Sequence, residues 1–214
     1  MMTTSHKTIA RLHGYRNSLF RLKHLGFVKV FSENLADAVG VTSSQVRKDL
    51  SLFGPSGNKR GGYLVDDLIP KLNQILGKDT PQNIIVVGAG NIGNALIHYP
   101  GFQREGIRIV AAFDQDQAKI NRDAAVPVLP LSELKEFVGR QYIKVGVIAV
   151  PDTAAQQVLD ELVAAGIKGI LNFAPIRLNA PDGIIINHVN VGVELETVIY
   201  FVNVANPPAL AEKN

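Results

Sequence analysis

Short apolar runs alternate with amphipathic segments through most of the chain beyond residue 80. The runs, rich in Ile, Val and Ala, occupy residues 84–87, 107–113, 126–129, 145–150, 169–172 and 184–188. Segments that fit helices separate them, at residues 91–99, 116–121, 131–138 and 152–165. Apolar strands that alternate with helices are typical of a parallel sheet covered on both faces. Ligands of such sheets bind beyond the carboxyl ends of the strands.

The first 78 residues have a helical pattern instead. Residues 8–25 carry apolar side chains at every third or fourth position, as an amphipathic helix does. Ser32 is expected to cap a second helix over residues 33–39. A third helix is expected to begin after Thr42 or Ser43, with an inward stripe formed by Val46, Leu50 and Phe53. Helix, short turn and helix is the plan of a helix-turn-helix domain.

A glycine-rich basic segment follows these helices. Residues 54–62 contain too much glycine for a helix and are expected to form the tip of a hairpin wing. A strand at residues 63–65 and a helix ending at Gly77 follow, and residues 78–81 are the expected linker. We therefore predict a winged helix-turn-helix domain at residues 1–78, a sheet domain at 79–192 and a C-terminal helix and tail at 193–214.

The outer face of the third helix carries side chains suited to DNA. Arg reads guanine edges and Gln reads adenine edges, while Ser and Lys hold phosphates. The wing tip adds a basic pair that can approach the DNA backbone or a narrow minor groove; its alternative is a solvated loop with no specific contact. The candidate DNA-binding residues are Ser44, Gln45, Arg47, Lys48, Lys59 and Arg60.

Charge and composition agree with this division. Residues 1–78 hold 12 Lys and Arg against 5 Asp and Glu, while the remainder holds 10 against 14. A basic first domain favours a polyanionic partner, most often nucleic acid. The chain has no Cys, which excludes disulfides and thiolate metal sites, and no metal is expected. It has no secretory leader pattern and no apolar stretch of about 18 residues, so we expect a cytoplasmic protein without a membrane partner.

A dinucleotide-binding pattern follows the first apolar run. In Gly88-Ala89-Gly90-Asn91-Ile92-Gly93 the first glycine permits a tight turn, the second lets backbone approach a pyrophosphate, and the third lets the next helix pack closely. The pyrophosphate would lie at the N-terminus of that helix. The second run ends in Asp114, at about the distance expected for a carboxylate that accepts hydrogen bonds from the ribose hydroxyls. The sequence therefore favours NADH and NAD⁺ over their phosphorylated forms, although such a glycine pattern alone also fits a structural turn.

Two further segments follow apolar runs and are candidate walls of the same pocket. Asp152 and Pro175, in these segments, have structural alternatives as a helix cap and a turn. An apolar nicotinamide pocket would disfavour NAD⁺, whose oxidised ring is cationic, because burial of a charge is costly. The remaining candidate cofactor residues are Tyr99, Val150, Pro151, Phe173, Ala174 and Pro175.

Taken together, four motifs resemble the bacterial Rex family: Ser44 to Ser51 followed by Phe53-Gly54, the glycine turn, Tyr99-Pro100-Gly101-Phe102, and Gly166 to Pro175. The resemblance implies a homodimeric winged-helix repressor with a Rossmann-type NAD(H)-binding domain. It also implies a sensor of the NADH/NAD⁺ ratio that binds a palindromic operator and leaves it when NADH binds, and is not an enzyme. In that family a C-terminal helix is exchanged between subunits; the candidate here is residues 193–204. The alternative is an ordinary core helix of its own subunit.

The chain departs from the family pattern in two places. The basic pair of the wing, in Gly57-Asn58-Lys59-Arg60-Gly61-Gly62-Tyr63, is displaced by one position. Where the family often carries an aspartate near the exchanged segment, this chain has Asn190. A neutral hydrogen bond from Asn190 to Tyr99 is the expected substitute for a salt bridge there.

Two other functions compete with a repressor. An NAD-dependent dehydrogenase needs a proton donor beside the nicotinamide; His98 and His188 are available, but neither has a carboxylate nearby in sequence. A CoA-binding domain uses a similar turn, and Asp114 argues against it.

Overall fold

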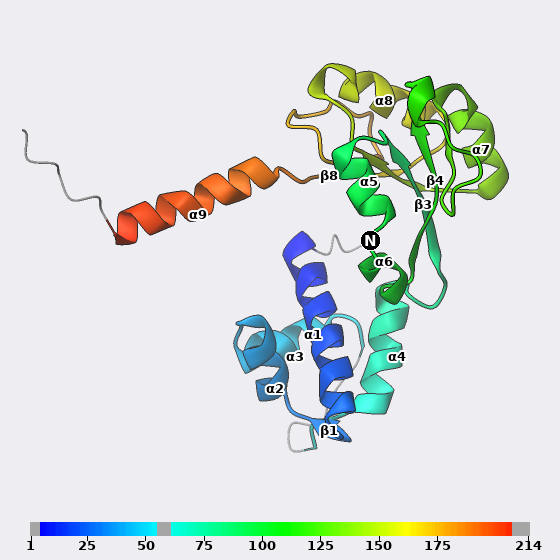
Figure 1. Ribbon diagram of the computed structural model, residues 1–214. Helices are drawn as coiled ribbons and strands as arrows, with labels where there is room; N and C mark the ends of the chain where they lie inside the picture. Colours follow the sequence, from blue (N-terminus) through cyan, green and yellow to red (C-terminus); the bar gives the residue numbers. More distant parts are fainter. Residues whose placement is uncertain (1–4, 55–60, 207–214) are drawn as a thin grey trace, which may run out of the picture. The chain divides into compact units, whose positions relative to one another are not determined.

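The computed structural model describes residues 5–54 and 61–206. The contacts divide the chain into two units, Met1–Pro81 and Gln82–Asn214 (Figure 1).

The first unit packs its helices around one apolar core. These helices are α1 (His6–His24), α2 (Ser32–Val39), α3 (Ser43–Ser51) and α4 (Val65–Ile75). The inward stripe predicted for the third helix is confirmed for Val46 and Leu50, which are fully buried against Leu12, Tyr15 and Leu19 of α1. Thr42 caps α3, since its Oγ1 accepts a hydrogen bond from the Gln45 N–H at 3.1 Å.

One predicted detail of this unit is wrong. Ser32 does not cap α2 but is its first residue; Phe31 holds the cap position, and its N–H donates to Asn34 Oδ1.

The predicted wing tip at residues 54–62 lies mostly outside the described residues. The strand β2 (Tyr63–Leu64) follows it. It pairs antiparallel with β1 (Lys29–Val30), which lies between α1 and α2 in the sequence.

The second unit is built on a parallel sheet, as the apolar runs predict. Within the described residues the sheet has six strands in the order β5-β4-β3-β6-β7-β8. The strands are β3 (Gln82–Val87), β4 (Ile107–Asp114), β5 (Val128–Pro130), β6 (Val145–Ile148), β7 (Gly169–Asn172) and β8 (Ile185–His188). The chain runs outward from β3 to β5 and then returns to the other side of β3 with β6. This is the doubly wound Rossmann order, with its switch point between β3 and β6.

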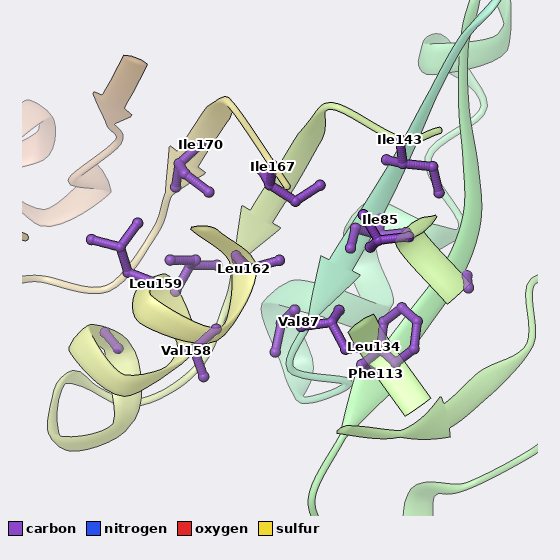
Figure 2. Close-up of a cluster of buried hydrophobic side chains, with 14 of the residues drawn as sticks. Ile85, Val87, Phe113, Leu134, Ile143, Val158, Leu159, Leu162, Ile167 and Ile170 are labelled. Carbon is purple, nitrogen blue, oxygen red and sulfur yellow. The ribbon is translucent and has the colours of Figure 1, made fainter. Parts of the chain in front are cut away.

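Helices cover both faces of this sheet. Alternate residues of β3 point to opposite faces, because the side-chain period of a strand is two. Ile85 and Val87 join the core beneath α7 (Leu134–Gln141) and α8 (Asp152–Ala164), as Figure 2 shows. Ile84 and Val86 join the smaller cluster that includes Leu96 and Ile97 of α5 (Asn91–Ile97).

Residues 116–121 do not form the predicted helix. They contain only a single 3-10 turn, η1 (Gln117–Lys119). A second such turn, η2 (Leu131–Glu133), precedes α7, and a short helix, α6 (Gly101–Arg104), was not predicted. In the chain, α6 precedes β4, η1 connects β4 to β5, and η2 connects β5 to α7.

The last described helix, α9 (Val191–Ala205), has no buried residue on its own chain. Its large apolar side chains are at least half exposed, among them Leu195, Ile199 and Phe201. The alternative of an ordinary core helix is therefore wrong for the described chain. None of the helices in residues 5–54 and 61–206 is long and apolar enough to cross a membrane.

Candidate nucleotide pocket and DNA-binding face

The glycine turn after β3 is shaped by close backbone contacts. Gly88 has a φ of +102°, and a Cβ there would lie 2.4 Å from the Ala149 carbonyl oxygen. A Cβ on Gly93 would lie 1.8 Å from the Gly88 carbonyl oxygen, so α5 can pack on the turn only without a side chain. Gly90, which precedes α5, has no atom within 4 Å of its Cβ position. Protein atoms therefore leave no room for a side chain at Gly88 or Gly93, whereas the space beside Gly90 is free.

Asp114 closes the same turn from the neighbouring strand. Its carboxylate is buried and accepts hydrogen bonds from the Ala89 N–H at 2.8 Å and the Asp116 N–H at 2.9 Å, one on each oxygen. The Lys119 ammonium lies 3.2 Å from Oδ2. Burial alone would raise the pKa of the Asp114 carboxyl, but the two N–H donors and Lys119 together hold that pKa below its ordinary value. Asp114 is therefore an anion at neutral pH.

A pocket of about 330 Å³ lies at the switch point of the sheet. Its volume is within the range of small-molecule sites. Gly88, Gly90, Asp114, Val150 and Pro151, all predicted cofactor residues, line it together. The remaining lining residues are Val87, Gln115, Asp116, Lys119, Leu131, Ala149, Ala154 and Val158.

The other predicted cofactor residues lie elsewhere in the second unit. Ala174 and Pro175 line a separate open hollow of about 660 Å³ that also includes His188 and Asn190. Tyr99 lines a third hollow of about 450 Å³, and its ring packs edge-on against Phe102. Phe173 is part of the smaller apolar cluster. The remaining residues of the turn differ in exposure: Asn91 and Ile92 are exposed, while Ala89 is buried.

Asn172, the last residue of β7, organises the loop that follows it. It is fully buried, and its Oδ1 accepts from the Ala174 N–H at 3.0 Å. Its Nδ2 lies within 3.1 Å of the carbonyl oxygens of Ala174 and Ile176 and of His188 Nδ1. These bonds fix the backbone of the loop that carries Ala174 and Pro175.

The described residues do not contain the expected bond between Tyr99 and Asn190. Asn190 Oδ1 instead accepts from the Val193 N–H at 3.1 Å and caps α9. The substitution of Asn for the family's aspartate therefore has a local role at the start of that helix.

The two histidines lack the partners that a dehydrogenase requires. His98 Nδ1 pairs with the Asn94 carbonyl oxygen at 2.8 Å, and His188 Nδ1 faces the Asn172 amide. Among the described residues no ion pair joins either ring to a carboxylate. The same part of the chain has no group of three or more His, Asp or Glu residues that could hold a metal ion.

The DNA-binding candidates divide between outer and inner positions on α3. Ser44, Arg47 and Lys48 are exposed, as predicted. The Arg47 guanidinium donates to Ser32 Oγ on α2 at 2.8 Å. Gln45, predicted on or near the outer face, is half-buried, and its Nε2 donates to Asp49 Oδ1 at 2.7 Å, so its amide is directed at a buried carboxylate. Lys59 and Arg60 lie outside the described residues.

Sequence reasoning missed Lys119 as a site residue. It was placed within an expected helix, whereas η1 carries it back to the Asp114 carboxylate and to the walls of two hollows. Its position five residues after the ribose-binding candidate was the available signal.

Comparisons with known proteins match both units. Residues 3–51 match the family model "Putative DNA-binding protein N-terminus", and residues 79–176 match "CoA binding domain". The chain is 45% identical to the redox-sensing transcriptional repressor Rex of Desulforamulus reducens over 90% of this chain and 92% of that one. It is 41% identical to Rex of Lactobacillus acidophilus over 92% and 93%.

Solved structures of RSP, a Rex-family repressor, are similar in fold. The complex of RSP with NAD⁺ and operator DNA matches with a TM-score of 0.88 and 36% identity, over 96% of this chain and 95% of that one. The complex with NADH matches with a TM-score of 0.84 and 35% identity, over 96% and 97%.

Proposed function

This chain belongs to the Rex family of redox-sensing transcriptional repressors, and we propose that it binds palindromic operator DNA as a homodimer and leaves it when NADH binds. The observation that carries this proposal is the presence in one chain of an exposed basic recognition helix and a dinucleotide turn closed by a buried aspartate. The members of this family are transcriptional repressors, so we reject the alternative that the chain is an NAD-dependent dehydrogenase. Its members act on DNA, and we place this chain in the cytoplasm accordingly.

The proposed nucleotide site is centred on the glycine turn and Asp114. The open backbone before Gly90 would approach the pyrophosphate. The Asp114 Oδ1 atom accepts one backbone N–H and retains a lone pair for a ribose hydroxyl, while Oδ2 already faces both Ala89 and Lys119. Lys119, whose ammonium lies 3.2 Å from Oδ2, would donate to the second ribose oxygen. The CoA-binding family model shares this turn, so CoA is the second ligand to be tested.

Redox discrimination would come from the charge of the nicotinamide ring. The oxidised ring is a cation, and apolar walls would penalise its burial. Of the predicted wall residues, Val150 and Pro151 line the pocket beside the glycine turn, whereas Ala174 and Pro175 line a separate hollow and would reach the ring only if the ligand extends there. A difference of about 2.8 kcal/mol would give roughly 100-fold discrimination between NADH and NAD⁺. A cation–π interaction between the Tyr99 ring and the oxidised nicotinamide would offset part of this penalty.

Coupling between ligand and DNA requires that the two dimer arrangements bind NADH with different affinity. Only one arrangement would place the two recognition helices about one DNA turn apart, ~34–36 Å. We propose that α9, whose apolar side chains are exposed on its own chain, is exchanged with the partner subunit and connects the two activities.

The proposed function is tested by measuring the anisotropy of a labelled operator duplex during parallel titrations with NADH, NAD⁺, NADPH and CoA. We expect NADH to release the DNA, with much weaker effects of the other three compounds. The variant Arg47→Ala is the control: it should lose its preference for the operator, at a cost of about 1–3 kcal/mol per half-site, and keep NADH binding intact. Release by CoA with no response to NADH would contradict the proposal, as would turnover of a small carbonyl substrate.

A further inference from the structure

Three side chains of the first unit, Arg11, Tyr15 and Gln45, meet at the buried carboxylate of Asp49 on the recognition helix. We name these four residues the Asp49 cluster. The Asp49 side chain is 1% exposed. Arg11 of α1 donates to it twice, through Nε to Oδ2 at 2.6 Å and through a terminal nitrogen to Oδ1 at 2.7 Å. The Tyr15 hydroxyl donates to Oδ2 at 2.9 Å. The Gln45 amide donates to Oδ1 at 2.7 Å.

This arrangement uses the full capacity of the carboxylate. Two oxygens offer about four acceptor positions, and the cluster supplies four donors. Burial alone would raise the pKa of the Asp49 carboxyl, but the donors Arg11, Gln45 and Tyr15 together lower it. An anion held in this way needs every donor, because a buried charge that loses a partner is costly.

The geometry of Gln45 conflicts with base reading. A glutamine that recognises adenine presents its amide N–H and its carbonyl oxygen together to one base edge. Here the amide nitrogen is directed at Asp49, one helical turn further along α3 and on its inner side. To reach a base, Gln45 would have to leave the anion one donor short.

Arg47 has the opposite arrangement. It is exposed on the outer side of α3, and its bond to Ser32 Oγ occupies one terminal nitrogen. A guanidinium has five N–H donors, so Arg47 keeps donors for a guanine edge. Ser44 and Lys48 are exposed on the same helix.

We propose that Gln45 is a positioning residue that reads no base, and that with Arg11 and Tyr15 it fixes the rotation of α3 through Asp49, which leaves base reading to Arg47. This inference rests on the proposed operator binding. If the orientation of α3 is less well fixed, a smaller fraction of molecules is ready to bind, and the apparent affinity for every DNA sequence falls by that fraction.

The test is a panel of operator duplexes in which each base pair is replaced in turn, measured with the full chain. Gln45→Met keeps the length and helix propensity of the side chain but removes its donor. We expect it to weaken binding to all duplexes by the same factor, about tenfold, and to leave the relative preference at each position unchanged. Arg47→Ala should instead flatten the preference at one or more positions.

A variant remote from the DNA separates positioning from reading. Tyr15→Phe removes another donor to Asp49 from the opposite side of the carboxylate and keeps the ring in the core. It should reproduce the uniform loss seen with Gln45→Met, and it supplies the measurement if Gln45→Met does not fold. Far-ultraviolet circular dichroism and NADH binding by the second unit report folding independently.

Two results would overturn the inference. One is a loss of preference at a single base pair in Gln45→Met, which would show that Gln45 reads that pair. The other is unchanged affinity in both Gln45→Met and Tyr15→Phe, which would show that the cluster does not position the helix. Failure of the wild-type chain to prefer any operator would instead contradict the proposed function itself.

Discussion

Replacing Asp114 with Asn is the most direct test of the nucleotide turn, because the two side chains have the same shape. Each carboxylate oxygen accepts one backbone N–H, from Ala89 and from Asp116. An amide has only one acceptor oxygen. In Asp114→Asn one backbone N–H must therefore face an NH₂ group, and Lys119 loses the nearer of its two carboxylate partners, Asp114 at 3.2 Å and Asp116 at 3.9 Å.

The magnitude follows from these bonds. A buried donor left without an acceptor costs about 1–3 kcal/mol, which is a substantial part of the roughly 5–15 kcal/mol that stabilises a domain. We expect Asp114→Asn to fold, with the free energy of unfolding of the second unit reduced by that amount. Loss of a charge-assisted bond to a ribose hydroxyl should also weaken NADH binding by roughly 10- to 100-fold.

The effect on stability should depend on pH. The folded-state pKa of Asp114 is lowered, so its contribution is present above the ordinary carboxyl pKa of about 3.9 and is lost as the pH falls through the lower folded value. The difference between wild type and Asp114→Asn should be constant near neutrality and shrink in acid below about pH 4.

The assay combines urea unfolding at several pH values with calorimetry of NADH binding. Asp116→Asn is the matched control: its side chain is half exposed, and it caps η1 through a single bond to the Ala118 N–H, which Asn can also accept. The control should change stability by less than about 0.5 kcal/mol. If Asp114→Asn were as stable as the control and bound NADH as tightly as wild type does, the Asp114 carboxylate would neither stabilise the turn nor bind the ribose.

Three further predictions concern other parts of the chain. Gly93→Ala should remove NADH binding, because the added Cβ would lie 1.8 Å from the Gly88 carbonyl oxygen and would distort the turn. In Gly90→Ala the added Cβ meets no atom of the free protein, so this variant should lose NADH affinity only because the methyl group contacts the ligand. Calorimetry of NADH binding to both variants makes the comparison. Lys59→Ala should weaken operator and random DNA alike and reduce the slope of log affinity against log salt by about one, and selective loss for the operator would assign it to base reading. Deletion of residues 193–214 should abolish dimerisation and tight operator binding, measured by light scattering and anisotropy, and a truncated chain that remained a dimer would exclude the exchanged helix.

The sheet could be predicted well from sequence because each strand contains or overlaps a short apolar run. Asp114 could be found because it ends such a run. Residues 116–121 could not be assigned in the same way: the segment is polar, and its conformation depends on Asp116 capping a single turn and on Lys119 reaching Asp114. Hydrophobic periodicity does not indicate these local bonds between polar side chains and their neighbours.

The inward direction of Gln45 was not predictable either. Helical periodicity places it at the border between the inner and outer faces. What decides its direction is Asp49, which can be buried on α3 only because Arg11, 38 residues earlier, supplies the opposing charge. Periodicity could not identify a buried polar residue whose partner lies on another helix. For the predicted cofactor residues, the motifs did not indicate that the loops which carry them line separate hollows.

The exposure of α9 has a consequence for how the protein reaches its final form. A helix of 15 residues is marginally stable in water without a packing surface, and on its own chain this helix buries nothing. If α9 is exchanged between subunits as proposed, its folding would depend on encounter with another chain and would become second order in protein concentration. When few copies are present, mass action would then leave this segment unfolded and open to proteases. The number of molecules in the cell would thus help to set the fraction of chains that have a folded α9 and can act as repressors.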